Sequence, residues 1–145
     1  MAAATVTTTN LSTFGKETSA GTFTDFAEVY DIDGPGIDRT MIDVSHMTSP
    51  NYSREFVPGF VDWGEVSVEI AYLPTATVII AAIADLTATD FSTLDTWRII
   101  PSGTSGYTWT FKGYCKSFKP KASLDDVLKA TIVIKLSGKP ATLPT

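Results

Sequence analysis

The chain has 145 residues and a formal net charge of −5, with 43% hydrophobic and 19% charged residues. This composition is too apolar for a disordered chain, and the length suits one domain with its own core. The acidic balance argues against a protein that reads DNA sequence, since such proteins need a basic surface to neutralise phosphates. No run of about eighteen apolar residues occurs, so we expect no membrane partner.

Charge is divided unevenly along the chain. Residues 1–111 contain fourteen acids and four bases, whereas residues 112–145 contain seven lysines and two aspartates. The simplest interpretation is a mixed surface on one fold. Such asymmetry also suits copies that meet head to tail, with an acidic face against a basic one.

The N-terminal part lacks the pattern of a folded element. Residues 1–21 are rich in Thr, Ala, Ser and Gly, so we expect a flexible N-terminal arm there and a single domain over 22–145. The segment 22–33 has aromatic and β-branched residues and ends at the turn signal "GPG", which predicts a strand. A short strand is expected at 39–44.

A long loop is then expected over 45–64, and its composition is unusual. It contains "SPNYSREFVPGF", with three aromatic residues and two prolines, although surface loops are normally small and polar. Two explanations remain open from the residues alone. Either the loop folds back on its own core, or it binds a partner.

The periodicity changes after this loop. Residues 65–73 alternate, with Val66, Val68 and Ile70 on one face and Glu65 and Glu69 on the other, which predicts a strand. The next apolar stripe has helical spacing and predicts one amphipathic helix, with Thr75 or Thr77 as the N-cap. Its members are Ile79, Ala82, Ile83 and Leu86.

The C-terminal third returns to strands. We expect strands at 96–100, 107–118 and 130–136, with a hairpin loop at 101–106. About six strands and one helix predict a mainly β protein: an antiparallel β-sandwich or barrel with one flanking α-helix.

The chemistry expected of an enzyme is missing. His46 is the single histidine and Cys115 the single cysteine, and Cys115 lies on an apolar strand face, where an inert buried thiol is expected. "DIDGPG" lacks the later ligands of a calcium loop. Glu65 and Glu69 could in principle act as the two carboxylates of a glycoside hydrolase. The simpler interpretation is that they form the solvent-exposed face of a strand. We therefore predict no catalytic, metal or cofactor site.

Two stretches carry a resemblance to a known family. "HMTSPNYSREFVPGFVDWGEVSVEIAY" and "YTWTFKGYCKSFKPKASLDDVLKATIVIKLSGKP" resemble, in order and spacing, the major tail tube proteins of bacteriophages with long non-contractile tails. The likeness covers roughly residues 20–140. It implies the tail tube fold and a structural virion protein that forms stacked hexameric rings, a conduit for DNA delivery.

The resemblance also implies partners and a location. The chain would bind copies of itself, and tape-measure, tail terminator and distal tail proteins would be further partners. DNA would pass without specific binding. Assembly would take place in the host cytoplasm, and the product would be part of the virion tail.

The same resemblance assigns roles to residues. Glu65 and Glu69 are candidate lumen-facing acids, with Lys112, Lys116 and Lys135 expected outside or between rings. The 45–64 loop would reach a neighbouring subunit. Its expected inter-subunit residues are Tyr52, Arg54, Glu55, Phe56, Pro58, Gly59, Phe60 and Trp63.

Two other functions stay open from the sequence. One is a related hexameric tube protein of a secretion system. The other is a monomeric β-sandwich binding module, for example for carbohydrate, with Trp63, Trp97 or Trp109 as a platform.

Overall fold

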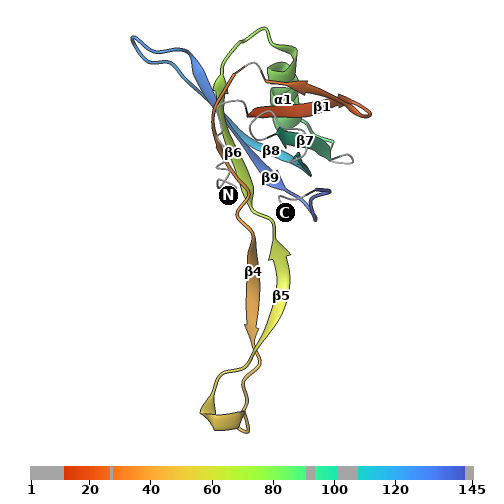
Figure 1. Cartoon of the computed structure of the whole chain (residues 1–145), viewed down its shortest axis with the longest axis vertical. Helices are drawn as coiled ribbons and strands as arrows, with labels where there is room; N and C mark the ends of the chain where they lie inside the picture. Colours follow the sequence, from red (N-terminus) through yellow and green to blue (C-terminus); the bar gives the residue numbers. More distant parts are fainter. Residues whose placement is uncertain (1–11, 27, 91–93, 101–107, 143–145) are drawn as a thin grey trace, which may run out of the picture.

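The computed structural model describes residues 12–26, 28–90, 94–100 and 108–142. Strands fill most of this part, all pairings are antiparallel, and one α-helix packs on them (Figure 1). The mainly β prediction is confirmed. The elements are β1 Thr13–Ser19, β2 Thr22–Asp25, β3 Val29–Asp33, β4 Asp38–Asp43, the 3-10 turn Pro50–Tyr52, β5 Phe56–Asp62, β6 Glu65–Ala71, α1 Thr77–Leu86, β7 Asp95–Ile100, β8 Trp109–Lys121 and β9 Lys129–Leu136.

Seven strands form one sheet in the order β2-β1-β7-β8-β9-β6-β3. β6 and β9 pair along their length, from Glu65 opposite Lys135 to Ala71 opposite Lys129. Their alternating residues point to opposite faces, so every second side chain enters the core. The buried set on these two strands is Val66, Val68, Ile70, Ala130, Ile132, Ile134 and Leu136.

The helix covers the apolar face of this sheet (Figure 1). Ile79 and Ala82 are buried, and Ile83 and Leu86 pack against the same core, which confirms the predicted stripe. The predicted cap is wrong. The helix begins after Ala76, whose side chain offers no hydrogen bond, so packing of the apolar face rather than capping stabilises it.

The N-terminal prediction needs correction at its C-terminal end. Residues 13–19, placed in the flexible arm 1–21, form β1 and pair with both β2 and β7. Phe14 causes this, because its fully buried ring stacks on Trp97 and on Phe26. Phe26 also interrupts the single strand expected over 22–33, which becomes β2 and β3. The expected arm residues 1–11 and the hairpin loop 101–106 lie outside the described residues.

The 45–64 segment is not simply a loop. Its second half is β5, which pairs with β4 to form a separate two-stranded sheet that extends away from the body (Figure 1). We call residues 38–62 the extended hairpin. Gly64 joins it to β6 with a φ of 74°, and a Cβ there would lie 2.2 Å from the carbonyl oxygen of Gly36. Only glycine fits that joint without strain.

Candidate functional site

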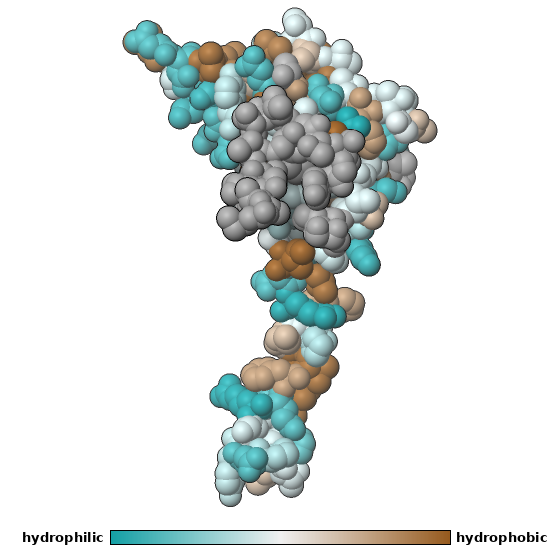
Figure 2. Space-filling view, in the orientation of Figure 1, coloured by the Kyte–Doolittle hydropathy of each residue, from teal (hydrophilic) through white to brown (hydrophobic). Residues whose placement is uncertain are grey.

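The extended hairpin exposes apolar side chains that no other described part of the same chain covers. Every residue of β4 is exposed, and no residue of β5 is buried. Figure 2 shows brown hydrophobic patches along the hairpin, with teal hydrophilic surface between them. Its exposed large hydrophobic residues are Met41, Ile42, Val44, Met47, Tyr52, Phe56, Val57 and Phe60.

An exposed ribbon of this kind is poorly stabilised by itself. Two strands without a covering layer are marginal in water, and a contiguous apolar patch on a soluble subunit typically marks a binding surface. Phe60 is 94% exposed, so its ring contributes almost nothing to the fold of its own chain. The hairpin is therefore a candidate interface.

Polar contacts shape the tip of the hairpin. The Glu55 carboxylate accepts a hydrogen bond from Ser49 Oγ at 2.8 Å and lies 3.5 Å from His46 Nε2. Arg54 lies 3.9 Å from Asp43. These acid–base contacts are local to the tip, so Arg54 and Glu55 have partners within the hairpin itself.

Most of the predicted inter-subunit residues lie where a partner could reach them. Tyr52, Phe56, Pro58 and Phe60 are exposed on the tip or on β5. Trp63 differs, because it is partly buried and packs against the core of its own chain.

Gly59 serves the packing of the hairpin itself. It lies within β5, and a Cβ there would approach the Thr40 carbonyl oxygen to 3.2 Å. A small residue therefore lets the two strands pack closely. Sequence reasoning missed the other half of the surface, Met41 and Ile42 of β4. Their signal was a predicted strand whose neighbouring positions are both apolar, so that it could not bury all of them on one face.

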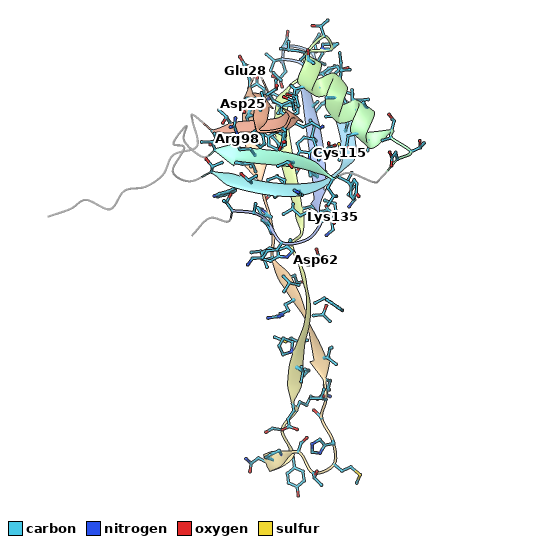
Figure 3. All side chains as sticks on the ribbon, turned by 90° about the vertical axis from the view of Figure 1, so that its right-hand side faces the viewer. Asp25, Glu28, Asp62, Arg98, Cys115 and Lys135 are labelled. Carbon is cyan, nitrogen blue, oxygen red and sulfur yellow. The ribbon has the colours of Figure 1, made fainter. Side chains whose placement is uncertain are left out.

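The outward face of the large sheet carries mixed charge. Glu65 and Glu69 point to this side, as the alternation predicted, but the expected separation from the lysines is not found. Lys116 Nζ lies 2.5 Å from Glu65 Oε1, and Lys129 Nζ lies 3.6 Å from Glu69 Oε1. Lys135 binds Asp62 at 2.7 Å, at the junction with the hairpin (Figure 3). The strand order β8-β9-β6 brings Lys116 and Lys129 against the acids of β6.

A group of titratable side chains lies at the contact between α1 and the sheet. Burial, followed by a hydrogen bond with Asp95, raises the pKa of Asp85 to about 6. The buried Lys16 lies 3.1 Å from Asp95, and Asp85 accepts a hydrogen bond from the Cys115 backbone N–H at 3.0 Å. These contacts tie α1 and β7 to β1 and β8.

The Cys115 thiol is buried, which favours its neutral form. Burial, followed by repulsion from Asp85 and Asp95, raises the pKa of its thiol to about 11. His46 lies on the hairpin tip and contacts Thr48 and Glu55 instead. Within the described residues, no group of three or more His, Cys, Asp or Glu side chains could hold a metal ion.

The binding-module alternative loses its aromatic platform. Trp97 is fully buried and donates its indole N–H to the Gly113 carbonyl oxygen at 3.2 Å. Trp63 and Trp109 pack against the same core. None of the three rings forms an exposed flat surface for a sugar.

Comparison with known proteins decides the family. The family described as "Lambda phage tail tube protein, TTP" matches residues 5–143. The chain belongs to this family. It is accordingly a structural tube protein, a component of the virion tail. No curated protein matches the sequence.

Solved structures agree with this tail tube protein in fold. One is a chain of the anti-feeding prophage baseplate, with 14% identity, 95% of each chain covered and a TM-score of 0.70. Another belongs to the tail of an empty gene transfer agent particle, with 13% identity, 90% of this chain and 95% of that chain covered, and a TM-score of 0.67. The SPP1 tail tube has 10% identity, with 92% and 77% covered and a TM-score of 0.67.

In the described part of this tail tube protein, no helix has the length and apolar character needed to cross a membrane.

Proposed function

We propose that this tail tube protein assembles into stacked hexameric rings, and that the resulting hollow tube conducts DNA into the host cell. The observation that carries the proposal is the extended hairpin, a two-stranded ribbon with eight exposed large hydrophobic residues. Such a ribbon gains its stability by docking on other copies. Ring and tube assemblies among the structures of the same fold support this arrangement.

Within the hairpin we assign the inter-subunit contacts to Tyr52, Phe56 and Phe60. Burying each of these side chains on a neighbour would contribute about 1.5–3 kcal/mol. Pro58 restricts the backbone of β5 before docking and so lowers the entropy lost on binding. Arg54 and Glu55 act at the tip, where their exposed ion pairs could exchange to a neighbour and set register more than affinity.

We further propose that the outward sheet face with Glu65 and Glu69 lines the channel. Each of these acids lies against a lysine of β8 or β9, so it cancels a cation that DNA phosphates would otherwise meet. The screening length is about 10 Å at 0.1 M salt, so this effect acts only on DNA close to the wall. Passage would then be passive, without specific binding of DNA.

The tube would end on other tail components. We infer contacts with tape-measure, tail terminator and distal tail proteins, and assembly in the host cytoplasm without a membrane partner. The similarity to chains of a tail and of a baseplate assembly supports contacts of this kind.

Concentrated protein tests the assembly. The full chain is examined by sedimentation velocity over rising concentration and by negative-stain microscopy. With rising concentration, we expect single subunits to form rings whose averaged images show sixfold symmetry. At higher concentration the rings should form hollow stacks. The proposal would be contradicted if the subunit stayed monomeric at every concentration, both alone and after addition of a tail extract that nucleates assembly.

DNA transit tests the channel face. Glu65→Gln and Glu69→Gln together remove the carboxylate beside Lys116 and leave Lys129 with Asp126 alone. We therefore expect tubes of normal length but slower DNA ejection, with a larger effect at low salt. Glu17→Gln is the matched acid-to-amide control, because Glu17 of β1 makes no ion pair with any described residue, and it should not slow ejection. If ejection kinetics equal those of the parent, the assignment of this face to the channel is refuted, whereas the proposal of assembly into rings is not affected.

An injection-system tube is the alternative. Chains of contractile injection systems share the fold, for example one at 11% identity and a TM-score of 0.71 over 96% of this chain and 97% of that chain. This likeness concerns the fold, whereas the family match favours the phage tail.

A further inference from the structure

The extended hairpin needs a receptor surface, and the exposed apolar residues elsewhere in the described chain identify one. Outside the hairpin and the adjoining Ile37, six large hydrophobic side chains are exposed. One is Ile80 on α1. The other five gather at a single end of the body: Tyr30, Leu73, Leu124, Val127 and Leu128.

Four of these five residues, all except Leu124, line a groove. It has a volume of about 310 Å³ and is lined by Glu28, Tyr30, Ala71, Tyr72, Leu73, Val127 and Leu128. We call it the distal groove. Tyr72 forms part of its floor, with its ring packed 5.5 Å from Phe118. The Lys129 side chain lies over the Tyr30 ring, with its Nζ 4.7 Å from the ring centroid.

The distal groove and the hairpin lie at opposite ends of the same strand. β6 starts at Glu65, next to the hairpin, and ends at Ala71, which lines the groove. Six steps of about 3.3 Å separate these ends by roughly 20 Å. The hairpin points away from the body on the side opposite the groove (Figure 1), and Glu28 and Asp62 mark the two ends in Figure 3. A chain therefore cannot place its own hairpin in its own groove.

Charge agrees with a contact between the two ends. The hairpin carries four acids and two arginines over 38–62, an excess of negative charge. Near the groove, the segment 119–129 carries three lysines and two aspartates, and Glu28 lines the groove itself. Lys129 is paired with Glu69 and Asp126, so the positive charge left for a partner is that of the other two lysines. Lys119 and Lys121 are exposed there and make no ion pair with any described residue. Opposite charges at the two ends would favour one orientation of docking.

We propose that the distal groove is the receptor for the extended hairpin of a second copy of this chain. The contact joins two different surfaces, so each bound copy leaves one free hairpin and one free groove, and the assembly propagates in one direction. The inference rests on the proposed function, which makes the hairpin an interface. It adds the residues that receive the hairpin and the polarity of the contact.

Single charge insertions test the proposal. Val127→Glu places a carboxylate in the groove, and Phe60→Glu places one on the hairpin. Ile80→Glu is the matched control, because Ile80 and Val127 are 54% and 52% exposed. All three changes are at exposed positions, so the unfolding midpoint should stay close to that of the parent. Assembly is measured as the concentration at which half of the subunits sediment as rings or stacks.

We expect Val127→Glu and Phe60→Glu to raise that concentration by about tenfold or more, since a carboxylate is costly to bury without a partner, and Ile80→Glu to leave it unchanged. If Phe60→Glu blocks assembly while Val127→Glu behaves as Ile80→Glu does, the groove assignment is overturned and the proposed function stands. If Phe60→Glu also assembles normally, the hairpin interface itself is refuted.

Disulfide trapping provides a second measurement, which reports directly which residues lie close together across the contact. Subunits with Met41→Cys are mixed with subunits carrying Val127→Cys, and the native Cys115 is buried and stays silent. A mixed disulfide between the two variants supports the groove. Disulfides between two hairpins, or with Ile80→Cys in place of Val127→Cys, would overturn it.

Discussion

Phe14 and Phe60 are both phenylalanines, but one is buried and the other is exposed. Substituting each of them therefore tests folding and assembly separately. The Phe14 ring is 0% exposed and stacks on two other aromatic rings, whereas the Phe60 side chain is 94% exposed on the hairpin. Truncating each to alanine removes the same atoms. Phe14→Ala should lower the free energy of unfolding of the subunit by about 3–5 kcal/mol. Phe60→Ala should change it by less than about 0.5 kcal/mol.

For assembly, we expect the substitution at Phe60 to have the larger effect. If Phe60 becomes buried on a neighbour, its side chain contributes about 1.5–3 kcal/mol to each contact. A factor of ten in an equilibrium constant corresponds to about 1.4 kcal/mol. Phe60→Ala should therefore raise the concentration needed for rings and stacks by about 10- to 100-fold.

Two measurements on the same samples check this reasoning. Urea unfolding, followed by tryptophan fluorescence below the assembly concentration, gives the stability of the isolated subunit. Sedimentation velocity over rising concentration gives assembly. A loss of several kcal/mol of subunit stability in Phe60→Ala would show that the ring is sheltered within its own chain. Unchanged assembly would show that no neighbour shelters it, and either result would refute the argument.

Two further predictions concern the body and its joint with the hairpin. Burial raises the pKa of Asp85 from its ordinary value of 3.8 to about 6, so the folded chain binds the proton more tightly than the unfolded chain does. The contribution of Asp85 to the free energy of unfolding should therefore fall as pH rises from about 4 to 6. Asp85→Asn should lose this contribution and Asp125→Asn should retain it, as measured by urea unfolding at each pH. At the joint, Gly64→Ala meets both a positive φ and the Gly36 carbonyl oxygen. It should cost the subunit about 1–3 kcal/mol and impair assembly, whereas Gly36→Ala, whose Cβ would meet open space, should be nearly neutral in both assays.

The sequence alone determined the parts of this protein that depend on local periodicity. Alternation in 65–73 and 130–136 predicted β6 and β9, and the stripe from Ile79 to Leu86 predicted α1, because these patterns reflect which side of an element meets the core. Cys115 was likewise expected to be a buried thiol from its place on an apolar strand face. The motifs around the 45–64 segment were enough to suggest the tail tube family.

Only the tertiary structure decided which apolar residues have shelter. Phe14 and Phe60 both occur in segments expected to be irregular, yet one enters the core and the other stays in solvent, because burial depends on partners distant in sequence. The same holds for Glu65 and Lys116, which the sequence separates by 51 positions and the sheet brings into contact. The distal groove combines residues of three separate segments. No local pattern contains that information, since it arises from the order in which the strands pair.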